Sequence, residues 1–181
     1  MELIDTHCHL TFDDLARDID TILARSIAAG VSEWITVGTD LQEDRKAIEF
    51  AERFDDMYTA IGIHPHDAKT MTENTIQELK KLAQHKKVVA IGETGLDYHY
   101  NLSLHEDQTR VFAEHLAIAA ELALPVIIHC RNAFDETMKI LDNYAGAVKK
   151  VVFHCFSGSA EQAKIVLDRG FYISFTGVVT F

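Results

Sequence analysis

Histidines and one glutamate close several of the apolar runs in this sequence. His7 and His9 stand two residues apart at the end of the first run, so in an extended strand both imidazoles point to the same side. Two later runs end in His129 and His154, and another ends in Glu93. Neutral imidazole and carboxylate are the ligands that hold zinc, manganese or iron in open catalytic sites. The pattern predicts a metal-dependent hydrolase.

These runs belong to a repeating pattern in which short apolar stretches alternate with longer amphipathic ones. Such alternation is typical of βα units that close on a parallel sheet. Runs that are apolar along their whole length indicate strands buried on both faces. We expect seven strands, close to residues 3–7, 33–37, 58–63, 88–93, 125–129, 150–154 and 171–175.

Helical spacing of apolar residues predicts three of the connecting helices. The first covers residues 19–27, the second starts after Thr72, and a longer one covers residues 111–122. His85 and His115 lie in two of these helical stretches. We interpret both as solvated histidines on helix surfaces rather than as ligands.

The pattern as a whole predicts an α/β fold of the TIM type, a (β/α) barrel with parallel strands. A complete barrel of this kind runs to about 250 residues, whereas the 181 residues here reach a seventh strand and then a turn. The sequence has no linker rich in proline, glycine or serine. We therefore expect one metallohydrolase barrel domain over residues 1–181, lacking its eighth βα unit.

A parallel barrel would bring the candidate ligands together, because the carboxyl ends of its strands converge on one face. Each histidine alone could be a hydrogen-bonded core residue. Their arrival at one face instead predicts two ions, about 3.5–4 Å apart, that share a bridging carboxylate and activate one water. The first ion would use His7, His9 and Glu93. The second would use Glu93, His129 and His154.

The composition restricts how this protein could contact nucleic acid. Lys and Arg number 17 against 28 Asp and Glu, a formal net charge of −11, which disfavours a long electrostatic footprint on nucleic acid. Contact would have to be local, at a pocket where bound divalent ions supply positive charge. The single tryptophan, Trp34, lies in a predicted strand, so the sequence gives no support for aromatic stacking on bases.

The three cysteines, Cys8, Cys130 and Cys155, each stand beside a candidate ligand histidine. If the histidines face inward, strand alternation turns the thiols outward, where cysteine packs as a small apolar group against covering helices. A disulfide framework is excluded. With no apolar run of about 20 residues and no secretory leader, we expect a cytoplasmic protein without a membrane anchor or an obligate protein partner.

Five short motifs lie at or just after the ends of predicted strands. They are Asp5-Thr6-His7-Cys8-His9, Gly62-Ile63-His64-Pro65-His66, Gly92-Glu93-Thr94-Gly95-Leu96-Asp97-Tyr98, His129-Cys130-Arg131 and His154-Cys155-Phe156-Ser157-Gly158. Together, and in this order, they resemble the signatures of the TatD family of metal-dependent deoxyribonucleases. The resemblance extends over the whole chain.

This resemblance implies a TIM-type barrel that hydrolyses phosphodiester bonds in DNA, often from a 3′ end, with two divalent ions that could be zinc, manganese or magnesium. It places His64 and Arg131 at the mouth of the active site and makes them, with Glu93, the candidate catalytic residues. Arg131 would suit a substrate phosphate because its planar fork donates two hydrogen bonds at once. The resemblance assigns metal ligation to His7, His9, Glu93, His129 and His154.

Two of the motif residues have alternative interpretations. Arg131 could form a surface ion pair with Asp135 or Glu136 instead of binding phosphate. Asp97 could shape the site, or it could cap the loop on which it lies. Both alternatives stay open from the sequence.

One departure from the family's pattern bears on activity. Members of the family carry an aspartate on the eighth strand, which ligates the first ion and handles the proton of the attacking water. No counterpart precedes Phe181. The resemblance therefore implies severely reduced activity for a chain that ends there.

Other functions fit the same residues. Removal of a D-amino acid from mischarged tRNA, or ester and amide hydrolysis as in the wider amidohydrolase superfamily, could use the same site, and fold alone cannot choose between them. Glu93 stands where that superfamily often has a modified lysine, which favours the TatD branch. A third alternative is a non-catalytic metal-binding fragment with exposed strand edges, which should self-associate.

Overall fold

The structure is a computed structural model in which residues 2–181 are described. Within that range seven strands form one parallel sheet, and each strand pairs with the next one in the chain. All seven strands predicted from the sequence are confirmed. Their bounds are β1 Leu3–Cys8, β2 Val31–Val37, β3 Met57–Ile61, β4 Val88–Asp97, β5 Val126–Arg131, β6 Val151–Phe153 and β7 Tyr172–Ile173.

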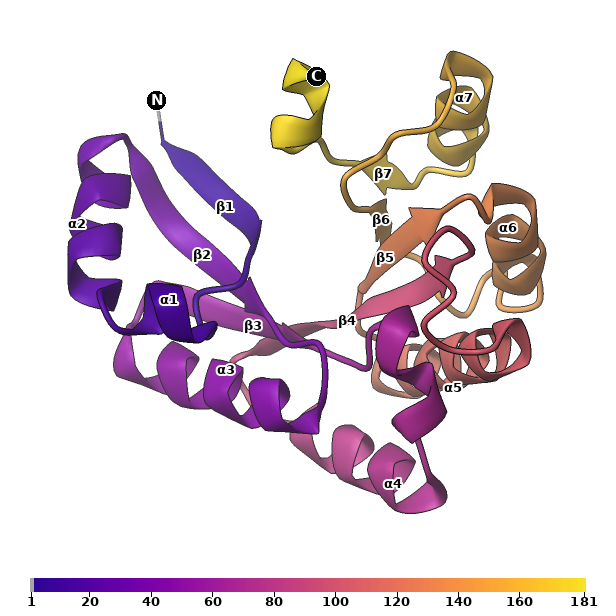
Figure 1. Ribbon diagram of the computed structural model, residues 1–181, viewed down its shortest axis with the longest axis horizontal. Coiled ribbons are helices and arrows are strands. Elements are labelled where there is room, and N and C mark those ends of the chain that lie inside the picture. The colour runs from indigo at the N-terminus through magenta and orange to yellow at the C-terminus, as the bar shows by residue number, and fades with distance from the viewer. Residues whose placement is uncertain (1) are drawn as a thin grey trace.

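The sheet curls into an arc with its helices on the outer side, as Figure 1 shows. In the described residues β1 and β7 stand at the two ends of the strand order. The expected α/β architecture, with parallel strands curved as in part of a barrel, is confirmed. Because all strands run in the same direction, their carboxyl ends lie along one rim of the arc.

The helices connect successive strands and cover the outer face. The three predicted helices are confirmed as α2 Ile19–Ala28, α4 Glu73–Leu82 and α5 His105–Leu122. Thr72 caps the start of α4, because its side chain accepts from the backbone N–H of Thr75. No helix within residues 2–181 is long and apolar enough to cross a bilayer. The remaining elements are α1 Asp13–Ala16, α3 Leu41–Arg53, α6 Phe134–Asp142, α7 Ala160–Asp168 and the 3₁₀ turns η1 Pro65–Thr70 and η2 Gly177–Thr180.

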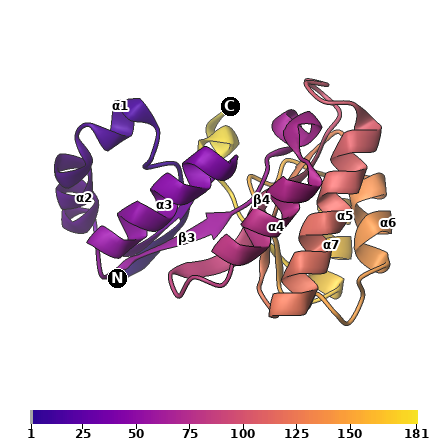
Figure 2. The same cartoon turned by 90° about the horizontal axis from the view of Figure 1, so that it is seen from below.

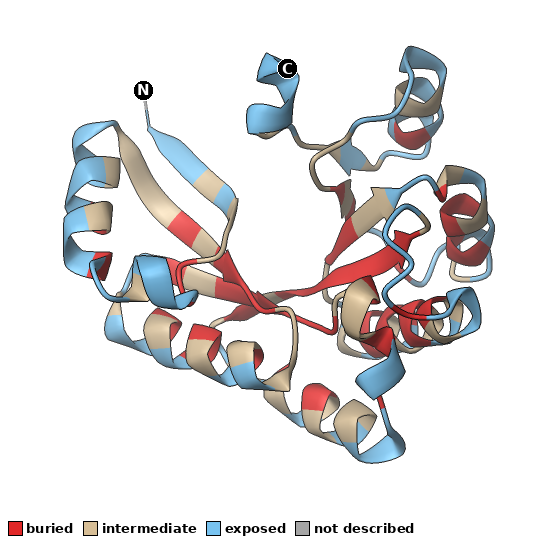
Figure 3. Ribbon diagram, viewed as in Figure 1, coloured by how far each residue is buried: buried red, intermediate tan, exposed pale blue. Residues whose placement is uncertain are grey.

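The core lies between the middle strands and the helices packed beneath them, which Figure 2 shows side by side. The main apolar cluster joins Ile91 and Leu96 of β4 to Phe112 and Leu116 of α5. Every residue of β4 except Val89 is buried, whereas β1 has no fully buried position. Burial therefore falls from the middle of the arc towards its ends (Figure 3).

The interpretation of His115 as a surface histidine is wrong. Its side chain is fully buried, because this face of α5 packs against β4 and η1. His115 Nε2 accepts from the backbone N–H of Ile63 at 2.9 Å, and Nδ1 lies 2.7 Å from the carbonyl of Val111, to which it donates. His85, by contrast, is half-buried after α4 and lies 3.2 Å from exposed Glu52.

The cysteines and the tryptophan take structural roles. All three cysteines are free, as predicted, and Cys130 Sγ lies 3.5 Å from the hydroxyl of Thr137 in α6, on the helix side of the sheet. Trp34 is buried, and its indole N–H donates to the Ser26 hydroxyl. Its ring is therefore closed to any ligand.

Candidate metal centre

The five residues predicted as ligands come from the carboxyl halves of four strands. His7 lies in β1 and His9 follows it, Glu93 lies in β4, His129 lies in β5, and His154 directly follows β6. Parallel strands bring these positions to one rim of the sheet. The structure gathers all five residues there.

Glu93 stands between two pairs of histidines. Its side chain is 6% exposed, and Oε2 lies 3.3 Å from His7 Nε2 and 3.9 Å from His9 Nε2. Oε1 lies 3.0 Å from His129 Nδ1 and 3.9 Å from His64 Nε2. Each carboxylate oxygen therefore faces its own pair of imidazoles, so that Glu93 could bridge two ions.

His154 lies on the His7 side of the carboxylate. The two imidazole rings stack with centroids 3.4 Å apart, and a nitrogen from each ring groups with a Glu93 oxygen within 4.8 Å. The sequence-based assignment places His154 with His129, whereas the structure groups it with His7. Among residues 2–181, Nδ1 of His7 and Nδ1 of His154 are buried without a hydrogen-bond partner, a costly state unless another ligand meets them.

A second group of histidines lies on the other side. His64, His66 and His129 each bring one ring nitrogen within 4.8 Å of the others, and His64 Nε2 lies 3.3 Å from His129 Nδ1. His64 begins the turn η1, where its Nδ1 accepts from the backbone N–H of His66. The two histidines of the His-Pro-His turn thus face the centre together.

Asp97 holds two of these histidines from behind. It is fully buried, and its Oδ2 lies 2.9 Å from His129 Nε2 and 3.0 Å from His66 Nε2. Its Oδ1 accepts from the backbone N–H groups of His99 and Tyr100 at 3.0 and 2.9 Å. The two interpretations left open by the sequence are therefore both present in the structure, since Asp97 shapes the site and also closes its own loop.

Gln108 fixes the position of Asp97 from helix α5. The buried amide of Gln108 accepts from the backbone N–H of Asp97 at 2.7 Å and donates to the Asp97 carbonyl at 3.1 Å. It also donates to the carbonyl of Ser103. A chain of buried hydrogen bonds thus runs from α5 through Asp97 to His129, and such support orients a metal ligand.

Two glycines on β4 allow Glu93 and His129 to approach each other. Gly92 and Gly95 have φ values of +144° and +134°, which side-chain-bearing residues rarely adopt. A Cβ on Gly92 would lie 2.5 Å from the carbonyl oxygen of Ile127, and one on Gly95 would lie 2.1 Å from that of His129. Side chains at these positions would push β4 and β5 apart.

The electrostatics favour neutral imidazoles around a charged carboxylate. Burial lowers the pKa of His64 to about 3 and, together with the neighbouring His7, that of His154 to about 4. Burial and His7 also lower the pKa of His9. Burial alone would raise the pKa of Glu93, but hydrogen bonds from His129 and His7 hold it well below its usual range. These are the protonation states that metal binding requires.

His129 is the exception among these histidines. Burial would lower its pKa, but the hydrogen bond to Glu93 and the contact with Asp97 raise it above the usual histidine value. The His129 side chain lies between the carboxylates of Glu93 and Asp97. A cation bound at Glu93 would also be bound by His129. The imidazole nitrogens and the Glu93 carboxylate of this centre fit divalent ions that accept both nitrogen and oxygen ligands.

Arg131 is exposed at the end of β5 and does not form the ion pair considered from the sequence. Within residues 2–181 its guanidinium contacts neither Asp135 nor Glu136 in an ion pair, and it stacks over the Tyr100 ring instead, with 4.8 Å between the guanidinium carbon and the ring centroid. Its Nη1 donates to the Tyr100 hydroxyl at 3.4 Å. The positively charged guanidinium of Arg131 is thus held against the Tyr100 ring, and it stays accessible to a ligand.

Three residues of the centre were not named as candidates from the sequence. His66 lies two residues after His64 in the same motif, so the His-Pro-His spacing carried a signal for it. Gln108 and Tyr100 carried none, because an isolated glutamine on a helix and a loop tyrosine have no distinctive spacing. Their roles depend on packing between α5 and the loop after β4.

Comparisons with known proteins agree with these motifs. The family described as TatD related DNase matches residues 4–181. The 3′-5′ ssDNA/RNA exonuclease TatD of Cronobacter sakazakii is 40% identical over 177 residues, which cover 98% of this chain and 67% of that protein. The uncharacterized metal-dependent hydrolase YabD of Bacillus subtilis is 42% identical over 179 residues, covering 99% of this chain and 70% of YabD.

A solved structure gives the same result for the fold. The crystal structure of YJJV, a TatD homologue from Escherichia coli, superposes with a TM-score of 0.92 at 31% sequence identity, covering 99% of this chain and 70% of that one. The predicted TIM-type fold is therefore confirmed, and a nearly full-length family match supports the same relationship. This chain belongs to the TatD family of metal-dependent hydrolases.

Proposed function

We propose that this chain is a metal-dependent nuclease that removes nucleotides from the 3′ ends of single-stranded DNA. The observation that carries the proposal is Glu93, whose two oxygens face separate histidine pairs on one rim of the sheet. Phosphodiester hydrolysis is a reaction for which paired ions bridged in this way are widely used. Several relatives, about 40% identical to this chain, are named 3′-5′ ssDNA/RNA exonucleases, which supports the choice of substrate.

The residues that would hold the ions divide at the Glu93 carboxylate. We assign His7 and His9 to the first ion with Oε2, and His129 to the second with Oε1, while His154 lies nearest to His7. Zinc, manganese and magnesium are all candidates for the centre. When bound, such ions would polarise a phosphodiester and lower the pKa of a water molecule.

The side chains around the centre would position the substrate. Arg131, held on the ring of Tyr100, offers a planar pair of donors to a phosphate at the mouth of the site. Asp97 accepts the Nε2 proton of His129, which leaves Nδ1, the nitrogen that faces Glu93, as the atom that would ligate an ion in place of its proton. The His64 side chain is 13% exposed and lies beside Glu93 and His129. Its neutral imidazole can donate to a substrate oxygen there.

The experiment is a nuclease assay on a single-stranded oligonucleotide labelled at its 5′ end, with Mn²⁺, Mg²⁺ or Zn²⁺ added in turn. We expect products that shorten stepwise from the 3′ end and a complete stop when EDTA is added. A Glu93→Gln preparation, purified identically, controls for contaminating nucleases. D-aminoacyl-tRNA and a simple phosphodiester are assayed in parallel. The proposal is overturned if either of them is hydrolysed while DNA stays intact with every metal.

A further inference from the structure

A pocket opens directly beside the candidate metal centre. Its volume is about 480 Å³, within the range of roughly 300–1,000 Å³ typical of small-molecule sites. Its walls come from three consecutive segments at the same rim of the sheet, which follow β4, β5 and β6. His154 belongs both to this lining and to the metal centre. A ligand in the pocket would therefore be adjacent to any group bound at the metals.

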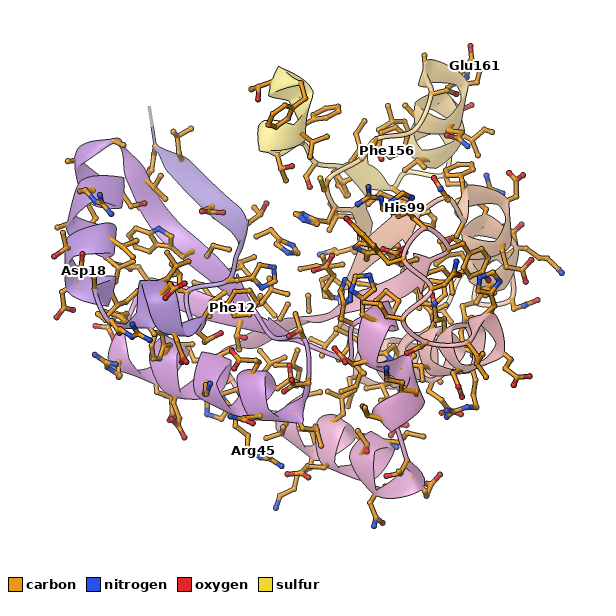
Figure 4. The ribbon with its side chains drawn as sticks, in the orientation of Figure 1. Phe12, Asp18, Arg45, His99, Phe156 and Glu161 are labelled. Carbon is orange, nitrogen blue, oxygen red and sulfur yellow. The ribbon has the colours of Figure 1, made fainter. Side chains whose placement is uncertain are left out.

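Aromatic rings from all three segments line the pocket. Tyr98 follows β4 and stacks on His105, with ring centroids 3.6 Å apart. Phe134 comes from the start of α6 and packs 6.1 Å from Phe153. Phe156 lies between β6 and α7, where Figure 4 shows it. Rings held on separate walls form flat apolar surfaces suited to a planar ligand.

The Phe156 ring is held in place by a close approach of the backbone. A Cβ on Gly158 would come within 2.7 Å of this ring and within 2.5 Å of the side-chain oxygen of Gln162. Gln162 in turn closes the start of α7 by accepting from the backbone N–H of Ser159. The Phe156 ring thus packs closely against the backbone of Gly158, which leaves no room for a larger residue there.

The polar groups of the pocket exclude an anion. Asp135, Glu136, Asn132 and Gln162 contribute carboxylate and amide groups, and no lysine or arginine is among the lining residues. Glu136 is close enough to Tyr98 to add to the rise in the pKa of that phenol that burial causes. A phosphate would be repelled here, whereas a neutral ring with N–H donors would find acceptors at its edge.

We propose that this pocket binds the nucleobase of the nucleotide whose phosphate lies at the metal centre, an inference that rests on the proposed nuclease function. The base stacks on the rings of Phe156, Phe134 and Tyr98, and its amino or imino groups donate to the acidic and amide side chains at the rim. Stacking of this kind is tolerant of sequence because every base has an aromatic face. Trp34, buried under α2, plays no part.

The first test uses oligonucleotides in which one of the last two nucleotides at the 3′ end lacks its base. We expect one of these abasic substrates to lose about 10- to 100-fold in kcat/KM, the size of one base stack. Phe156→Leu should lose a similar factor on intact DNA and should distinguish less between intact and abasic ends than the wild type does. Phe134→Leu provides a second variant from another wall. Phe50→Leu, a half-buried phenylalanine of α3, is the matched control.

The second test needs neither metal nor cleavage. Saturation-transfer NMR in EDTA should detect binding of deoxyadenosine to the wild-type protein and to Phe50→Leu, with a much weaker signal for Phe156→Leu and Phe134→Leu. Binding without any nuclease activity would refute the proposed function but retain the pocket. The inference is overturned if deoxyadenosine does not bind, if only a cation such as tetramethylammonium does, or if intact and abasic ends are cleaved equally.

Discussion

The histidines on the two sides of Glu93 are supported in different ways. On the inner wall, formed by β4, β5 and the loop after β4, His129 is held by Asp97, which is itself held by Gln108 and two backbone N–H groups. On the edge wall, formed by β1 and the segment after β6, His7 and His154 have a buried Nδ1 without a partner among residues 2–181. β4 is almost fully buried, whereas β1 has no fully buried residue.

This difference indicates that the fold organises the inner wall, whereas bound ions would complete the edge wall. The inner wall is set by buried hydrogen bonds that exist before any ion binds, so its ligands are pre-organised. On the edge wall His9 Nδ1 lies 3.0 Å from the carbonyl oxygen of Val37, but the stacked rings of His7 and His154 each keep an Nδ1 without a partner among residues 2–181, so an ion would complete the orientation of these two rings. Glu93 is the residue that both walls share.

Replacement of Glu93 should have the largest effect, because this carboxylate faces histidines of both walls. Glu93→Gln keeps the volume but removes the charge. We expect a loss of about 10³-fold or more in metal-dependent hydrolysis, equivalent to several kcal/mol of charge stabilisation, and a lower metal stoichiometry by elemental analysis. Exposed Glu49→Gln on α3 is the control. Unchanged stoichiometry in Glu93→Gln would show that the carboxylate does not bridge ions.

The pH dependence of the unfolding free energy should report on His115, a buried histidine behind the inner wall. Burial lowers the pKa of His115 to about 4 in the folded state, below the value of about 6.5 expected in the unfolded chain. The contribution of neutral His115 to stability is therefore fully present above pH 6.5 and is lost as the pH falls from 6.5 towards 4. The loss should approach about 3 kcal/mol at the acidic end.

Urea unfolding at several pH values measures this dependence. His115→Gln should make the change in unfolding free energy between pH 6.5 and 4 smaller by about 3 kcal/mol, leaving the part that His64 and His154 contribute, and His85→Gln, a half-buried histidine outside the core, is the matched control. His115 accepts from the backbone N–H of Ile63, the residue before His64. A pH profile that is the same in His115→Gln and the wild type would place the titrating group elsewhere.

Asp97→Asn should weaken the inner wall without removing a ligand. The amide keeps the shape but loses the charge that accepts from His129 and His66. Changes to such supporting groups typically cost about 10- to 100-fold in metal affinity or activity, which titration calorimetry with Mn²⁺ or Zn²⁺ can measure. Asp142→Asn, at the exposed end of α6, is the control. Equal affinities for both variants would show that Asp97 does not orient a ligand.

How much of this could be predicted from the sequence depends on the range of the interactions. The strands and five candidate ligands follow from local periodicity, since a histidine at the end of an apolar run marks its position on the rim of a parallel sheet. The support for Asp97 does not follow from periodicity, because Gln108 reaches it from a helix. Burial of His115 likewise depends on which face of α5 meets β4. The aromatic pocket joins three loops that sequence spacing does not relate.

The effect of metal removal on backbone hydrogen exchange should be the smallest of these effects, and it should separate the two walls directly. Hydrogen exchange measured with and without added Mn²⁺ compares the backbone of β1, Leu3–Cys8, with that of β5, Val126–Arg131. We expect EDTA to raise exchange in β1 by about 10-fold, because local opening there is opposed mainly by the ion, and to change exchange in β5 by less than about twofold. If β5 changed as much as β1, the hydrogen bonds from Asp97 would not hold the inner wall in the absence of metal. Both walls would then depend on bound ions for their organisation.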